Sequence, residues 1–255
     1  MLSKIKALKG YRLAALDGLE GNVWKAKEFY FDDRLWTIRF LVANTGDWLA
    51  GRQILISTEA LIAVVREEQS IRVNLTRQEI ENSPSLDTDK LAARQSAESS
   101  FACRDTPALL VGTDGGGLDS CIDGDGEPLR TSTQNDGAWD PHLRSTQALG
   151  GCSIQALDGD FGRVEDFIFD DETWTIRYLI IDTGAWRPGK KVLVSTQWIE
   201  RAGWSQSAVL VNLSRDAIRQ SPEYSGESLP TRDYETDLHD HYKRKAYWVD
   251  ELVNS

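Results

Sequence analysis

A long internal repeat constrains the fold of this 255-residue chain more than any other feature. The stretch FDDRLWTIRFLVANTGDW at residues 31–48 returns as FDDETWTIRYLIIDTGAW at residues 169–186. A shift of 138 residues superposes residues 32–84 on residues 170–222 without a gap, and about 20 of the 53 aligned positions are identical. Similarity at a fixed shift is the mark of a repeated structural unit, so two copies of one unit are predicted.

The repeat also sets the domain boundaries, and the charge follows them. The net charge is −11, but the two repeats are nearly neutral. The segment between them holds 5 Lys and Arg against 11 Asp and Glu, and the tail holds 4 against 8. Such a chain has no overall electrostatic attraction to nucleic acid or anionic lipid. We expect repeat 1 at residues 1–86, an acidic and largely irregular Gly/Ser/Asp-rich linker at 87–150, repeat 2 at 151–222 and an acidic tail with a helix at 223–255.

Within one repeat, the hydrophobic pattern is that of short strands. In WTIRYLIID, at residues 174–182, side chains alternate between two faces. About six such strands in roughly 60 residues leave no room for helical crossovers, which favours a small antiparallel barrel. One short helix is expected after each barrel, because Thr76 and Glu79 form a capping box and Ser214 occupies the cap position in repeat 2. The predicted fold is mainly β: two six-stranded antiparallel barrels joined by a long linker.

The motifs shared by the two repeats resemble those of the PRC-barrel superfamily. They are LDGxxG, FDDxxWTxR(Y/F)L, TGxWxxG, VxST and VNL(S/T)R followed by SP. This superfamily includes the cytoplasmic barrel of the photosynthetic reaction-centre H subunit and the C-terminal domain of the ribosome-maturation factor RimM. The chain is most similar to small stand-alone bacterial PRC-barrel proteins, whose tails also resemble DLHDHYKRKAYW at residues 237–248. The resemblance implies β-barrels that act as interaction modules and not as catalysts.

We therefore expect a non-catalytic adaptor that binds a protein partner. Duplicated modules often associate by two-fold symmetry, so the two barrels are expected to pair within the chain as a pseudo-dimer. The alternative is a module that senses a small ligand or an ion, with the cleft between the barrels or the acidic linker as its site. The partner itself is not identified by the sequence.

Aromatic and basic residues are the candidates for partner binding, because interface hot spots are enriched in Trp, Tyr and Arg. We single out Trp48 and Trp186 in the hairpin loops and Arg39 and Arg177 in the repeated strand. The tryptophans also fit a structural role, as covers of a barrel end.

Paired carboxylates, at residues 32–33 and 170–171, are the candidates for acid/base catalysis or cation binding. Each pair precedes a Trp at the end of a strand, where Asp is a common turn residue, so the structural interpretation is favoured. Ser57 and Ser195 have no His within either repeat that would activate them. A hydrolase is accordingly the least favoured hypothesis, and no enzyme activity is expected.

No metal or cofactor is expected. The DGDGE stretch at residues 123–127 begins like a calcium loop but does not complete its spacing. His239 and His241 offer two imidazoles, and His142 with Cys152 offer two further ligands, but no second pair stands at a usable spacing.

Cellular location is inferred from what the sequence lacks. No apolar run reaches the roughly 20 residues that cross a bilayer, so no membrane insertion is expected. The three cysteines are odd in number and are expected to be free thiols. These features favour the cytoplasm.

Overall fold

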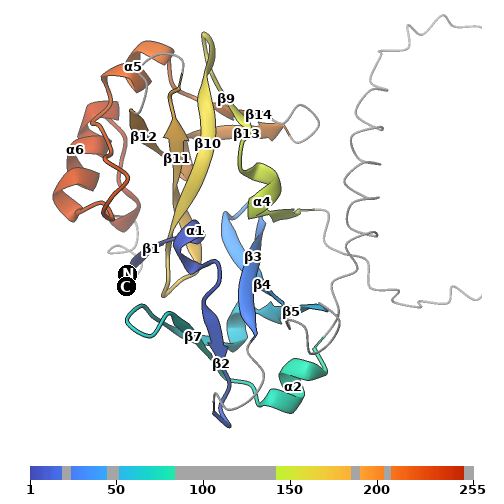
Figure 1. Ribbon diagram of the computed structural model, residues 1–255. Coiled ribbons are helices and arrows are strands. Elements are labelled where there is room, and N and C mark those ends of the chain that lie inside the picture. Colours follow the sequence, from blue (N-terminus) through green and yellow to red (C-terminus); the bar gives the residue numbers. More distant parts are fainter. Residues whose placement is uncertain (19–23, 45–51, 84–141, 185–189, 204–207, 250–255) are drawn as a thin grey trace, which may run out of the picture.

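The computed structural model places most of the two repeats and the tail (Figure 1). It describes residues 1–18, 24–44, 52–83, 142–184, 190–203 and 208–249. The prediction of a mainly β protein is confirmed, because 14 strands join in one sheet. Among the described residues, every helix is too short or too polar to cross a membrane.

Each repeat contributes six strands in the same order along the chain. In repeat 1 the neighbours run β6-β7-β2-β3-β4-β5, and in repeat 2 they run β13-β14-β9-β10-β11-β12. The strands of repeat 1 are β2 (Arg12–Ala14), β3 (Lys25–Asp32), β4 (Thr37–Asn44), β5 (Gln53–Ser57), β6 (Leu61–Val65) and β7 (Ser70–Val73). Those of repeat 2 are β9 (Ser153–Ala156), β10 (Gly159–Asp170), β11 (Thr175–Asp182), β12 (Lys191–Ser195), β13 (Ile199–Gly203) and β14 (Ala208–Val211).

The prediction of two closed, wholly antiparallel barrels is wrong. The last strand of each repeat returns to the free edge of the first strand and runs parallel to it, as β2 with β7 and β9 with β14. The chain between the two parallel strands of each pair consists of the other strands of the repeat and not of a long helix. The short spacing between strands, which leaves no room for a helical crossover, therefore did not exclude a parallel pair. One-turn 3-10 helices, η2 (Thr58–Ala60) and η4 (Thr196–Trp198), then redirect the chain, and no pairing joins β5 to β6 or β12 to β13 among the described residues.

The two repeats meet at equivalent residues, which is why the strands form one sheet. Thr37 of β4 is paired with Thr175 of β11. The N–H of Ile38 donates to the carbonyl of Trp174 at 2.8 Å, and the N–H of Ile176 donates to the carbonyl of Trp36 at 2.7 Å. Both tryptophans adopt left-handed backbone conformations, with φ of 54° and 56°. The junction is therefore reciprocal.

Short segments that precede the six strands of each repeat are exchanged between the repeats. Strand β1 (Leu2–Lys4) pairs with β10 of repeat 2, and the helical turn α1 (Ile5–Leu8) follows it. Strand β8 (Leu143–Ser145) pairs with β3 of repeat 1, and α4 (Thr146–Leu149) follows it. In Figure 1 the blue α1 lies against the yellow β10, and the green α4 lies beside the blue β3. Each repeat is thus completed by the other repeat's leading segment.

Aromatic side chains fill the core between the repeats. The ring of Phe29 lies 6.5 Å from that of Phe169, and the equivalent pair Phe31 and Phe167 lies at 6.3 Å. All four rings are buried. The contacts cross from one repeat to the other, so the hydrophobic core is continuous through the junction.

A short helix follows each repeat, α2 (Arg77–Glu81) and α5 (Arg215–Gln220). The predicted capping box of Thr76 and Glu79 is present. The LDG turn adds a second cap that was not predicted, because Asp17 and Asp158 each accept the first N–H of the following helix, at 3.0 and 2.7 Å.

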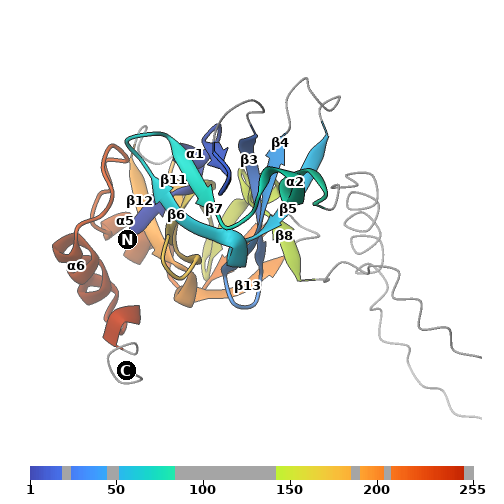
Figure 2. The same cartoon turned by 90° about the horizontal axis from the view of Figure 1, so that it is seen from below.

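The tail carries the longest described helix, α6 (Arg232–Tyr242), which packs against repeat 2. Figure 2 shows α6 on the side of the molecule that carries β11 and β12. Buried Leu238 and Tyr242 face this surface, and Trp198 of η4 contacts Tyr242 with ring centroids 4.6 Å apart.

Candidate functional site

The first carboxylate of each repeated pair stabilises a turn. Asp32 accepts the N–H groups of Arg34 and Leu35 at 2.8 and 3.0 Å. Asp170 accepts the N–H of Glu172 at 3.2 Å. Such Asx turns satisfy backbone donors where the chain reverses before the left-handed Trp.

The second carboxylate of each pair holds an exchanged segment. Asp33 accepts hydrogen bonds from His142 at 3.0 Å and from Arg144 at 3.1 Å. His142 directly precedes β8, and Arg144 lies in it. Asp171 accepts from the hydroxyl of Ser3 in β1 at 3.0 Å. The second carboxylate of each pair thus contacts the segment that leads into the other repeat.

The hydroxyl motif VxST is also used by the backbone. Ser57 and Ser195 accept the N–H of the residue two positions on and so begin the 3-10 helices. Thr58 and Thr196 donate to the carbonyls of Ile38 and Ile176 at 3.1 and 2.9 Å. These backbone hydrogen bonds give the motif a structural role in both repeats.

The structure places two of the four candidate partner-binding residues, Arg39 and Arg177. Trp48 and Trp186 lie outside the described residues. Arg39 is exposed on β4. Its equivalent, Arg177, lies 4.1 Å from the ring centroid of Tyr247 in the tail and 3.5 Å from a carboxylate oxygen of Asp170.

A buried polar cluster joins the tail to repeat 2. Glu235 of α6 is 2% exposed, and one of its oxygens accepts the hydroxyls of Tyr178 and Tyr247, each at 3.0 Å. Its other oxygen lies 3.2 Å from Arg232. His239, also 2% exposed, lies 3.1 Å from the hydroxyl of Tyr178. Buried polar groups are tolerated when they are hydrogen-bonded to one another, as here.

Burial shifts the acid–base behaviour of this cluster. Removal from water raises the pKa of the Glu235 carboxyl, although Arg232 acts in the opposite direction. Burial lowers the pKa of the His239 imidazole, which favours its neutral form. The rings of Trp198 and Trp248 lie edge-on to this imidazole, at 5.1 and 5.3 Å. The cluster therefore joins α6 to repeat 2 through two buried groups whose pKa values are shifted in opposite directions.

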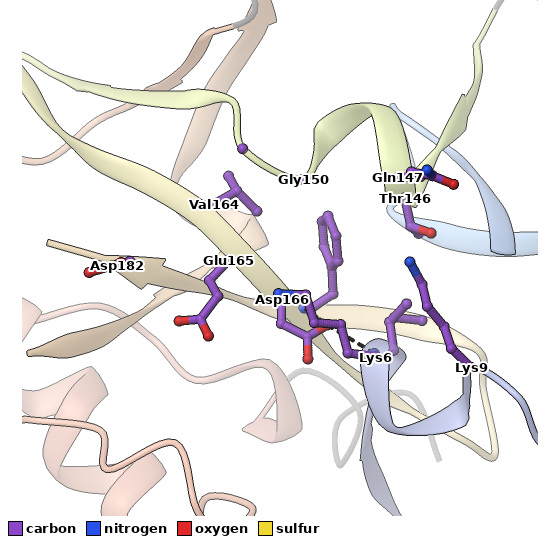
Figure 3. A pocket seen from close by; sticks show the side chains of 12 residues that line it. Lys6, Lys9, Thr146, Gln147, Gly150, Val164, Glu165, Asp166 and Asp182 are labelled. Atoms are coloured by element: carbon purple, nitrogen blue, oxygen red, sulfur yellow. Dashed lines mark hydrogen bonds between the residues drawn. The ribbon is translucent and has the colours of Figure 1, made fainter. Parts of the chain in front are cut away.

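A cavity of about 400 Å³ lies where the two exchanged segments approach each other (Figure 3). Lys6 from α1 and Gln147 from α4 line it together with strand β10. Asp166, which is buried, accepts the N–H groups of Lys6 and Phe167 at 3.1 and 2.8 Å. The residues that line this cavity are Ile5, Lys6, Lys9, Thr146, Gln147, Gly150, Gly151, Val164, Glu165, Asp166, Phe167 and Asp182. Ammonium and carboxylate groups share the wall, so the cavity suits a ligand that carries both signs of charge.

Asp166 and its equivalent Glu28 are the residues that the sequence reasoning missed. Glu28 is buried and accepts the hydroxyl of Ser145 in β8. The available signal was an acidic residue at the same position of both repeats, directly before the apolar runs FYF and FIF. Burial raises the pKa of Asp166, while the two backbone N–H groups lower it.

The suggested metal ligands do not converge. His142 contacts Asp33, and the buried thiol of Cys152 lies 3.4 Å from the carbonyl of Ala148. The DGDGE stretch lies outside the described residues. Within the part of the chain that the structure describes, no three His, Cys, Asp or Glu side chains are grouped so that they could hold a metal ion.

Comparison with known proteins adds no assignment: no protein-family model matches the chain, and no curated protein matches it significantly.

Proposed function

We propose that the chain is a non-catalytic adaptor that binds a protein partner through two PRC-barrel-like repeats arranged as an intrachain pseudo-dimer. The motif set shared with that superfamily supports the proposal, as does the use of repeated polar side chains in turns, caps and segment exchange. Arg39 and Trp48 of repeat 1 and Arg177 and Trp186 of repeat 2 remain the proposed contact residues.

The observation that carries the proposal is the seating of α6 on repeat 2. An amphipathic helix lies on the outer surface of β11 and η4, with Trp198, Tyr242 and Leu238 at the contact. Recognition of a helix by a groove with aromatic anchors is a common mode of protein binding. A fold that holds its own helix in this way is suited to holding a partner's helix.

Affinity capture tests this function. Immobilised full-length protein is expected to retain one defined assembly from a lysate of its native host, at both low and moderate salt, and mass spectrometry identifies it. An Arg39→Glu variant is the matched test of the surface and is expected to lower the retained amount. Retention no greater than on empty resin would count against the adaptor.

The second candidate function is sensing of a small ligand or ion. The cavity of Figure 3 favours it, because both exchanged segments and β10 line that space, so a bound ligand would bridge the repeats. A ligand that prefers the folded state raises its stability, so thermal unfolding in the presence of amino acids and divalent cations is the test. An unchanged melting temperature with every compound would reject this candidate.

A further inference from the structure

A second cavity, of about 440 Å³, opens on the seam between the two repeats. Repeat 1 supplies its turn before β4, repeat 2 supplies β11 and the start of β13, and the tail supplies one aromatic ring. The residues that line it are Arg34, Leu35, Trp36, Thr175, Arg177, Ser195, Thr196, Gln197, Ile199 and Tyr247. The cavity exists only because the repeats are joined, since neither repeat provides more than part of its wall.

The polar lining is basic and neutral. The guanidinium groups of Arg34 and Arg177 lie beside hydroxyl groups and the Gln197 amide, and no carboxylate is among the described residues that line the cavity. Arg177 is already paired with Asp170 at 3.5 Å. Arg34 is exposed and forms no ion pair with any residue that the structure places, so its charge is available to a ligand. Arg34 is therefore the lining cation that is open to an anionic ligand.

The opposite end of the seam has the reverse character. The position equivalent to Arg34 is Glu172, and the position equivalent to Gln197 is Glu59. Both ends keep an arginine, Arg39 at one and Arg177 at the other. Two replacements at matched positions thus put carboxylates at the opposite end, where Glu172 lies 3.4 Å from the N-terminal ammonium of Met1. The backbone hydrogen bonds of the two Trp residues at the junction are the same at both ends, so Arg34 is not needed for this strand pairing.

Apolar groups adjoin the basic ones. Leu35 is 65% exposed at the rim, and the largely buried Trp36 lies beside it. Ile199 and the ring of Tyr247 complete this side. An exposed leucine next to a cationic cavity offers contact area to the non-polar part of a ligand whose charged group faces Arg34.

We propose that the seam cavity is a binding site for a small organic anion, a carboxylate or phosphate monoester that carries a ring or short apolar group. The guanidinium of Arg34 would hold the anionic oxygens, which it matches in geometry, and the Gln197 amide would donate a further hydrogen bond. The apolar group would lie against Leu35 and Tyr247. This site goes beyond protein binding and does not depend on it.

Calorimetric titration of the full chain with phenyl phosphate and, separately, with benzoate tests the site. We expect at least one of the two anions to bind with one site per chain, and the stronger binder tells phosphate from carboxylate preference. Arg34→Glu installs the residue of the opposite end and is expected to weaken binding about tenfold or more, the loss expected of a charged hydrogen bond. Gln197→Glu is expected to weaken it in the same direction, and it serves as the test if the first variant does not fold.

Glu172→Arg is the matched control, because it changes the net charge as much as Arg34→Glu but at the other end of the seam. Its affinity for the same anion is expected to change less than that of Arg34→Glu, because Glu172 does not line the cavity and salt screens exposed charges. The proposal is overturned if neither anion binds, if Arg34→Glu binds as tightly as the unaltered chain, or if Glu172→Arg strengthens binding as much as Arg34→Glu weakens it. Loss of lysate retention by the Arg39 variant tests protein binding separately, so the two proposals fail independently.

Discussion

Glu28 and Asp166 stand 138 residues apart in the sequence, occupy the same place in the two repeats, and each accepts a hydrogen bond from the segment that precedes the other repeat. Ser145 donates to Glu28, and the N–H of Lys6 donates to Asp166. The exchange is therefore anchored by a buried carboxylate on each side, in addition to strand pairing.

Replacing Asp166 tests this anchor. Asp166→Ala leaves the N–H groups of Lys6 and Phe167 without their acceptor, and we expect it to lower the free energy of unfolding by about 1–3 kcal/mol. Asp166→Asn keeps an acceptor oxygen and is expected to cost less, which urea unfolding of both variants will measure. Equal losses in the two variants would show that the hydrogen bonds are not the stabilising feature.

The apolar side of the exchange is carried by Ile5 and Leu8 of α1, each 1% exposed. Truncating either to Ala removes buried methyl groups and leaves a cavity, so each variant is expected to lose about 2–5 kcal/mol of unfolding free energy. Lys9→Ala, at an exposed position next to α1, is the control and should change stability by no more than about 0.5 kcal/mol. If the three Ala variants lose the same free energy of unfolding, α1 does not dock on repeat 2 as described.

The LDG turn gives a prediction about helix caps. Asp158 accepts the N–H of Arg215 at 2.7 Å, and Gly159 next to it has φ of 127°, a conformation that favours glycine. Asp158→Ala is expected to lower the unfolding free energy by about 0.5–2 kcal/mol. Asp216→Ala, which removes only an exposed pair with Arg219 at 3.8 Å, should have little effect in the same denaturation measurement. A larger loss for Asp216→Ala would reject the cap.

Most of the strand content and the helix caps follow from local sequence, because alternation and a capping box act over a few residues. The exchange does not. LSKIKALKG at residues 2–10 and LRSTQALGG at 143–151 are related, but their similarity does not say which repeat each one completes. The parallel pairs were missed for a similar reason, since register between distant strands depends on contacts across the whole repeat. The seam cavity needs both repeats in place, so Arg34 could not have been linked to Gln197 from spacing alone.

Acid is expected to weaken the docking of α6 through His239. Burial lowers the pKa of this imidazole, so the unfolded chain takes up the proton first, and the stability it contributes is lost as the pH falls below about 6.5. Glu235 acts in the opposite sense, because its raised pKa makes the folded chain hold a proton that the unfolded chain releases. The charge of Asp240, on the same helix, raises the pKa of His239 and so acts against the effect of burial.

Comparing His239→Gln with the unaltered chain isolates the imidazole, since Glu235 and Asp240 are present in both. The variant is expected to be less stable at about pH 7.5, and its deficit should shrink at about pH 5.5. Denaturant unfolding at the two values measures this difference. A deficit that is constant with pH would show that His239 does not titrate in the docked helix as expected.

The joining of the two repeats by exchanged segments is tested most directly by cutting the chain between them. A specific protease site inserted within residues 112–118 allows the purified protein to be cleaved into two fragments, each of which keeps its repeat and the segment that completes the other. If the exchange holds the repeats together, the fragments will co-elute in size-exclusion chromatography with light scattering, at the mass of the uncut chain. Fragments that separate and elute at their own masses under native conditions would contradict it.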